Sequence, residues 1–91
     1  MTARYRQKEG ENLRRVIHLH RWLASGELLT DVTPPDETDG ATVTNVLILP
    51  GALSFQFFVQ GDEAGSIVDI DFEVDTSQGQ RRIDRVQIVV T

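Results

Sequence analysis

The chain of 91 residues contains no cysteine, which excludes disulfide bridges and thiolate chemistry. It has no run of 18 or more apolar residues, so no membrane-spanning helix is predicted. Its start, MTARYRQKEGENLRR, lacks the apolar segment of a secretory signal, and export by that route is not indicated. With 40% hydrophobic and 25% charged residues, the composition is that of one small globular domain.

Motifs that carry catalysis are also missing from the sequence. None of the serines lies in a G-x-S-x-G nucleophile elbow. The segment GDEAG at residues 61–65 resembles a glycine-rich phosphate loop, but it contains no lysine and no helical pattern follows it. We therefore expect a protein without enzymatic activity and without a cofactor.

Two groups of residues have side chains that metals prefer, but neither has the spacing of a metal site. His18 and His20 are expected on one face of a strand, and the sequence places no third ligand near them. Acidic residues alternate over residues 69–75, so their carboxylates point in parallel at roughly 6–7 Å and do not converge on one ion. The members of this acidic stripe are Asp69, Asp71, Glu73 and Asp75. We expect a solvated face, partly neutralised by Arg82 and Arg85, with a protein-binding stripe as the alternative.

What the sequence has in abundance is alternation of apolar and polar residues. From Ser54 to Thr91, apolar residues fall at every second position between two glycine-containing turns, which predicts the last three strands of an antiparallel sandwich. Earlier strands are expected over residues 15–20, 27–32 and 42–49, with a loop at 33–41. Strand signals at intervals of roughly 8–12 residues are typical of an all-β protein, and we expect an antiparallel β-sandwich of about seven short strands.

The final two strands are expected to form a hairpin whose register follows from this alternation. With a loop of about five residues from Ser77 to Arg81, the expected cross-strand pairs are Val68 with Val90, Ile70 with Ile88, Phe72 with Val86, and Glu73 with Arg85. A shift by one residue would turn the acidic stripe toward the core, so that register is excluded.

Charge is divided unevenly along the chain, whose net charge is −5. Residues 1–21 contain six basic and two acidic residues, whereas the remaining 70 contain three basic and twelve acidic ones. We interpret residues 1–14 as a basic, flexible and extended N-terminal arm, followed by a domain over residues 15–91. The arm is either a solvated terminus or a segment that docks on a neighbouring protein. Contact with nucleic acid is disfavoured because the rest of the surface would repel phosphates.

Two aromatic positions suggest how the domain meets a partner. Trp22 is either a central core residue or an exposed anchor. Phe57 and Phe58 are adjacent, so in a strand they face opposite sides, and one of them points away from the principal core. The candidate partner contacts in the sequence are Arg4, Arg6, Lys8, Arg14, Arg15, Trp22 and Phe58. Catalytic, cofactor-binding and metal-binding residues are not expected.

Three segments carry a resemblance to a known family: RWLASGE at residues 21–27, FVQGDEAGS at 58–66, and VDTSQGQ at 74–80. Together they resemble small tailed-phage fibre-tail adaptor and related virion structural proteins with an immunoglobulin-like β-sandwich, over roughly residues 16–91. The chain departs from the family pattern at Asp62, where a second glycine is common, and at His20, where an acid is common. The shared motifs are mostly turns, so they indicate the fold more strongly than the role.

The resemblance implies a non-enzymatic structural protein of the virion, made in the host cytoplasm. It would be an adaptor that joins tail, neck or fibre components through protein–protein contacts. Other virion proteins are its implied partners, without nucleic acid or membrane contact, and it would be oligomeric in the particle. The residues leave two alternatives open. One is a stand-alone immunoglobulin-like module that binds carbohydrate or a cell-surface ligand. The other is an accessory domain of an enzyme, which the initiating Met1 and the expected strand count disfavour.

Overall fold

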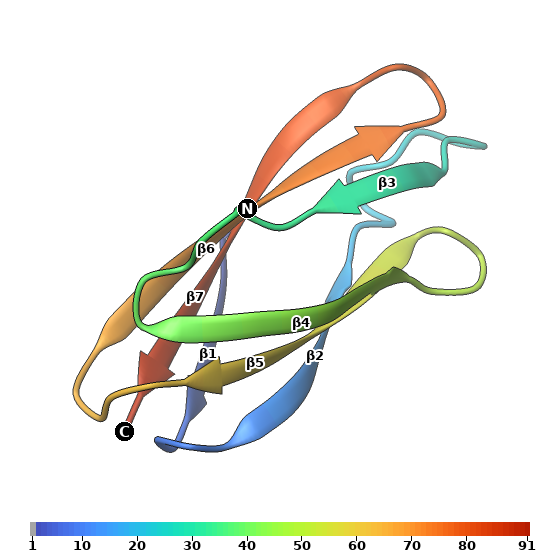
Figure 1. The fold of residues 1–91 in the computed structure, drawn as a ribbon. Helices are drawn as coiled ribbons and strands as arrows, with labels where there is room; N and C mark the ends of the chain where they lie inside the picture. Colours follow the sequence, from blue (N-terminus) through green and yellow to red (C-terminus); the bar gives the residue numbers. More distant parts are fainter. Residues whose placement is uncertain (1) are drawn as a thin grey trace.

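Seven β-strands make up more than half of the chain (Figure 1), and no helix occurs among residues 2–91, which the computed structural model describes. Met1 lies outside the described residues. In chain order the strands are β1 (Thr2–Gln7), β2 (Asn12–His18), β3 (Leu29–Thr33), β4 (Ala41–Ile48), β5 (Ser54–Gly61), β6 (Ile67–Thr76) and β7 (Arg81–Val90). Within this described range, no helix is long and apolar enough to cross a membrane.

The strands form two sheets that pack face to face. One sheet has four strands in the order β1-β7-β6-β3, and the other has three in the order β2-β5-β4. All neighbouring strands are antiparallel except β1 and β7, which run parallel. The orders β2-β5-β4 and β7-β6-β3 match strands B-E-D and G-F-C of immunoglobulin domains, although β1 joins the G-F-C sheet here. The predicted all-β sandwich of about seven strands is confirmed.

Alternation along the strands places one set of side chains between the sheets. Phe55 and Phe57 of β5 meet Phe72 of β6, with ring centroids 5.2 Å apart for Phe55 and Phe72 and 4.8 Å apart for Phe57 and Phe72. All three side chains are fully buried. Aromatic rings at such separations stabilise a core beyond the burial of their area. The end of β5 also approaches β7 closely. A side chain does not fit at Gly61, since a Cβ atom there would lie 2.6 Å from Cγ2 of Val90.

Residues 2–7 form strand β1 inside the four-stranded sheet, which differs from the predicted flexible arm. Tyr5 packs against the core, and the buried side-chain amide of Gln7 donates to the carbonyl of Val59 at 3.0 Å. β2 follows after a short connection, so the predicted domain boundary after residue 14 falls inside a strand. The inward side chains of β1 do not form a run of strongly apolar residues, and periodicity therefore does not reveal this strand.

β6 and β7 form the predicted hairpin with the predicted faces, but the predicted register is wrong by two residues. The observed pairs include Val68 with Ile88, Ile70 with Val86, Phe72 with Asp84, Asp71 with Arg85, and Glu73 with Ile83. The connection is tighter than expected because the Thr76 N–H donates to the carbonyl of Gln80 at 3.0 Å. Gly79 adopts a φ of 80°, which lets the chain reverse within that short span.

Candidate functional site

A buried carboxylate lies where the turn before β3 meets the β6–β7 hairpin. Glu27 is 1% exposed, and its oxygens accept hydrogen bonds from the Ala24 N–H at 3.0 Å and from the Thr76 hydroxyl at 2.6 Å. The bond from Thr76 and then the bond from Ala24 lower the pKa of Glu27, against the opposing effect of burial. The bond from Thr76 joins two of the three motif segments, residues 21–27 and 74–80, so Glu27 has a structural role.

Trp22 is half-buried and packs against the core. The guanidinium carbon of Arg82 lies 4.8 Å from the centroid of its ring, a typical cation–π distance. The Arg82 guanidinium therefore lies over the Trp22 ring, away from the acidic stripe. The expectation that Arg82 neutralises this stripe is wrong. Arg81 takes that place: it donates to Asp75 at 2.7 Å, and this bond lowers the pKa of Asp75.

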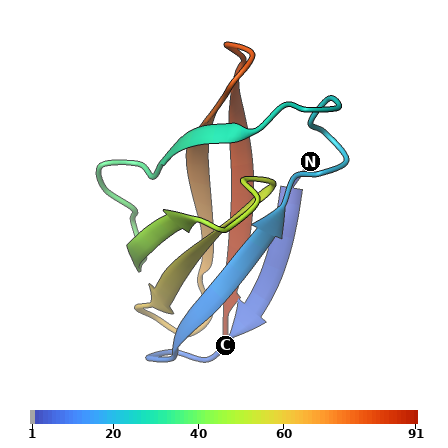
Figure 2. The ribbon, with the colours of Figure 1, turned by 90° about the vertical axis from the view of Figure 1, so that its right-hand side faces the viewer.

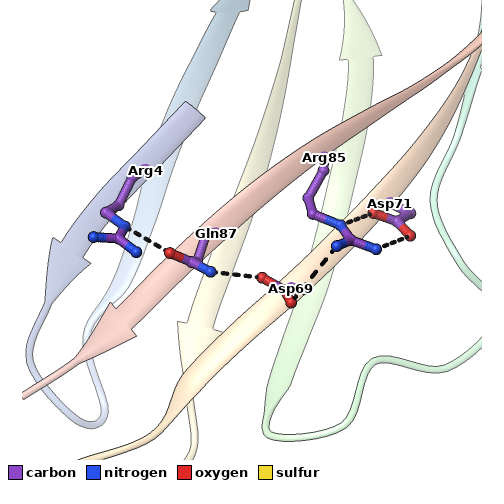
Figure 3. A network of polar contacts seen from close by, with 5 residues as sticks. All are labelled: Arg4, Asp69, Asp71, Arg85 and Gln87. Carbon is purple, nitrogen blue, oxygen red and sulfur yellow. Dashed lines mark hydrogen bonds and ion pairs between the residues drawn. The ribbon is translucent and has the colours of Figure 1, made fainter. Parts of the chain in front are cut away.

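Charged side chains on the outer face of the four-stranded sheet form a connected network (Figure 3). Arg4 donates to the side-chain oxygen of Gln87 at 2.6 Å, and the Gln87 amide donates to Asp69 at 2.9 Å. Arg85 donates to both carboxylate oxygens of Asp71 at 2.8 and 3.1 Å, and lies 4.0 Å from Asp69. The hydrogen bond from Arg85 lowers the pKa of Asp71. The acidic stripe is thus partly neutralised by Arg85, as predicted.

The basic residues near the N-terminus include exposed ones and internally bonded ones. Arg6 and Lys8 are exposed. Arg15 is half-buried, and its guanidinium carbon lies 4.7 Å from the ring centroid of Tyr5. The same group donates to the Arg6 carbonyl at 3.2 Å and to the side-chain oxygen of Gln7 at 3.1 Å. Arg15 therefore links β1 to β2, and these contacts lie within the protein.

An open apolar hollow lies on the outer face of the three-stranded sheet. Phe58 is half-buried there, while its neighbour Phe57 is fully buried in the core, which confirms that the pair faces opposite sides. The hollow has a volume of about 360 Å³ and is lined by Asn45, Val46, Leu47, Gln56 and Phe58. Leu47 is 57% exposed, so a large apolar side chain meets solvent at this place.

A strand irregularity and a basic residue shape the surroundings of this hollow. The pairing of β4 with β5 shifts between Thr44 and Leu47, and Asn45 adopts a φ of 52° within that bulge. Arg14 lies opposite Phe58 in the register of β2 and β5, and its Nε donates to the side-chain oxygen of Gln56 at 2.8 Å. The apolar hollow is therefore bordered by a positive charge.

The two histidines do not form the expected pair on a strand. β2 ends at His18, and His20 lies in the turn that follows, so the prediction of a shared strand face is wrong. Both side chains are exposed, with ring centroids 6.4 Å apart. Among the residues that the structure describes, no three His, Cys, Asp or Glu side chains are grouped so as to hold a metal ion.

Glu27 and Asp84 are buried acids that were not predicted from the sequence, and only Asp84 had a signal in the alternation. Asp84 is 3% exposed and lies opposite Phe72 on the inner face of β7, where burial raises the pKa of its carboxyl. The signal was present, because Asp84 has the same position in the alternation as Val86 and Ile88, which face the core. The misplaced register put Val86 opposite Phe72 and left Asp84 without an assigned environment.

Comparison with protein families agrees with these observations. The family described as Gp77, podophage GP4 fiber-tail adaptor protein gp77, matches residues 7–91. No curated protein matches the chain. The family match spans nearly the whole sandwich and contains all three motif segments, including the two turns that Glu27 joins, so the family resemblance is confirmed. The chain therefore belongs to the podophage GP4 fiber-tail adaptor protein gp77 family, and it is a phage fibre-tail adaptor structural protein.

Proposed function

We propose that this protein joins tail, neck or fibre components of the phage particle through protein–protein contacts, as one of several copies and without catalysis. Membership of the adaptor family supports a component of the virion that binds other tail or fibre proteins. The single observation that carries the joining role is the hollow formed by Phe58 and Leu47 on the outer face of the three-stranded sheet.

This hollow has the composition of a protein interface. Aromatic residues are favoured where binding energy is concentrated, and a half-buried ring such as Phe58 loses little side-chain freedom when a partner covers it. The exposed Leu47 adds apolar area next to it. Arg14 and Gln56 supply the polar border that commonly surrounds the apolar centre of an interface. We therefore assign Phe58 and Arg14, together with Leu47, as partner contacts.

The charge of the chain favours protein partners over nucleic acid or anionic membranes. Residues 22–80 contain no lysine or arginine, so β3, β4, β5 and β6 present no basic residue to a phosphate. The two buried acids are not positioned as a catalytic pair: Glu27 holds the turn before β3, and Asp84 lies in the sandwich interior. We propose that the protein is made in the host cytoplasm and then incorporated into the virion.

Substitutions in the hollow test the proposal in the phage itself. Leu47→Glu and, separately, Phe58→Ala are introduced into the gene, and purified particles are assayed by mass spectrometry for this protein and for the fibre proteins. We expect at least a tenfold loss of incorporated adaptor or attached fibre. Ile67→Glu is the matched control, because Ile67 is 62% exposed on the other sheet and outside the hollow. Circular dichroism of each purified variant checks folding.

Normal particles from both hollow variants would contradict the proposal. The alternative of a carbohydrate-binding module makes a separate prediction, namely that the isolated wild-type chain binds a glycan array and that Phe58→Ala abolishes this binding. Normal particles together with glycan binding would replace the adaptor role with the carbohydrate-binding one.

A further inference from the structure

One side of the sandwich carries a concentration of basic residues. Arg4 and Arg6 lie on the outer face of β1, and Lys8 follows directly after this strand. All three are exposed, whereas Arg15 is directed into the contact between β1 and β2. We call Arg4, Arg6 and Lys8 the basic edge. Because β1 ends the order β1-β7-β6-β3, no further strand among residues 2–91 covers this side of the sheet.

The opposite edge of the same sheet, at β3, is acidic and hollowed. A cavity of about 450 Å³ lies beside the end of β3 and is lined by Thr33, Pro34, Pro35, Asp36, Asp71, Glu73 and Ile83. Its apolar floor includes Ile83, which is 54% exposed, and two half-buried prolines. Asp36 and Glu73 are exposed beside it, and Glu37 and Asp39 follow in the connection to β4. We call this region the acidic hollow.

The fold separates the basic edge and the acidic hollow so that they cannot meet within one molecule. β1 and β3 are the two outer strands of the four-stranded sheet, with β7 and β6 between them. Figure 2 shows β1 on one side of the sandwich and the connection from β3 to β4 on the other. Within one molecule, Arg4 already donates to Gln87, and Asp71 of the hollow is paired with Arg85. The other charges of the two surfaces, Arg6 and Lys8 on the edge and Asp36 and Glu73 at the hollow, can complement one another between two copies.

We propose that copies of this chain associate head to tail, with the basic edge of one copy seated in the acidic hollow of the next. Long arginine and lysine side chains suit this hollow, because their aliphatic stems can cover Pro34, Pro35 and Ile83 while their charged ends reach Asp36 and Glu73. The two surfaces differ, so the contact is heterologous and repeats from copy to copy, closing as a ring or continuing as a filament.

At physiological salt, the repulsion between two chains of net charge −5 is weakened more than the pairing of charges in contact. Charges separated by more than the Debye length of about 8 Å are largely screened, whereas pairs in contact are screened much less. The inference rests on the proposed function only for its setting, in which several copies act in one particle. It uses surfaces distinct from the hollow of Phe58 and Leu47.

A charge-swap experiment tests the proposal on the full chain. Variant one carries Arg4→Glu and Arg6→Glu, and variant two carries Asp36→Lys and Glu73→Lys. The mass of each is measured by light scattering at about 0.15 M and about 1 M salt. We expect wild type to self-associate at the lower salt, and each variant alone to weaken association at least tenfold. An equimolar mixture should recover it, because each reversed surface then meets its opposite on the other variant.

The control for net charge is Asp62→Lys with Glu63→Lys, which lie exposed in the β5–β6 connection and change the net charge as variant two does. This control should associate like wild type. A wild-type monomer at every concentration tested, unchanged association of the variants, or no recovery in the mixture would each overturn the head-to-tail contact. None of these results affects the particle assay of Leu47 and Phe58, so failure here is distinguishable from failure of the adaptor role.

Discussion

Glu27 and Thr76 lie 49 positions apart in the sequence, and the hydrogen bond between them joins two turns at one end of the sandwich. Ser77 strengthens this junction, since its hydroxyl accepts from the Leu28 N–H at 3.0 Å and its own N–H donates to the Leu28 carbonyl at 2.8 Å. A buried carboxylate is costly unless its oxygens are hydrogen-bonded, which both oxygens of Glu27 are. The conformation of the turn before β3 therefore depends on one distant hydroxyl.

At the residue scale, Thr76→Val should destabilise the protein because it removes that hydroxyl and leaves one buried oxygen of Glu27 without its donor. We expect the Tm to fall by about 5–10 °C. The pKa of Glu27 should also rise toward its ordinary value, as NMR titration of the carboxyl can show. Thr44→Val makes the same chemical change at an exposed strand position and should alter the Tm much less. Equal shifts in the two variants would show that the junction adds no stability.

At the scale of the element, β1 is the strand on which sequence and structure differ most. If residues 2–7 are deleted and Met1 is kept as the start, β7 loses its parallel neighbour and the carbonyl of Val59 loses the hydrogen bond from the Gln7 amide. We expect thermal unfolding by circular dichroism to show a Tm lower by about 10 °C or more, with increased aggregation through the uncovered edge of β7. Arg4→Ser with Arg6→Ser keeps the strand while removing its charge, and should leave the Tm nearly unchanged. An unaltered Tm after deletion would instead support a dispensable arm.

Alternation predicts strands and faces well, because side-chain direction depends only on position within a strand. It assigned Phe57 and Phe58 to opposite sides, which the structure confirms. It could not give the hairpin register, which depends on how Thr76 and Gln80 close the turn. Likewise, the hollow at Phe58 depends on a bulge at Asn45 that no alternation pattern specifies. β1 escaped prediction because its inward side chains, Ala3, Tyr5 and Gln7, do not form a run of strongly apolar residues, and because its partner strand β7 is far away in the sequence.

At the scale of the whole molecule, the acidic groups divide into two sets with opposite effects on stability. Hydrogen bonds from Thr76, Arg85 and Arg81 lower the pKa values of Glu27, Asp71 and Asp75, respectively. These groups contribute stability that is present above their unfolded pKa values, about 4.5 for Glu and 3.8 for Asp, and is lost as pH falls through the folded values. Acid should therefore destabilise the sandwich below about pH 4.5.

Asp84 acts in the opposite direction, since burial raises the pKa of its carboxyl above 3.8 in the folded protein. The contribution of Asp84 to the free energy of unfolding is fully present below pH 3.8. It is lost as pH rises through the folded pKa, because folding then keeps in the interior a carboxyl that would be ionised in the unfolded chain. Asp84→Asn removes this titration while keeping nearly the same shape. We expect the Tm of Asp84→Asn, relative to wild type, to increase by a few degrees between about pH 3 and pH 7 in thermal unfolding at constant ionic strength. A difference that stays constant over this range would mean that Asp84 titrates alike in the folded and unfolded chains, and that it adds nothing to the pH dependence of stability set by the hydrogen-bonded carboxylates.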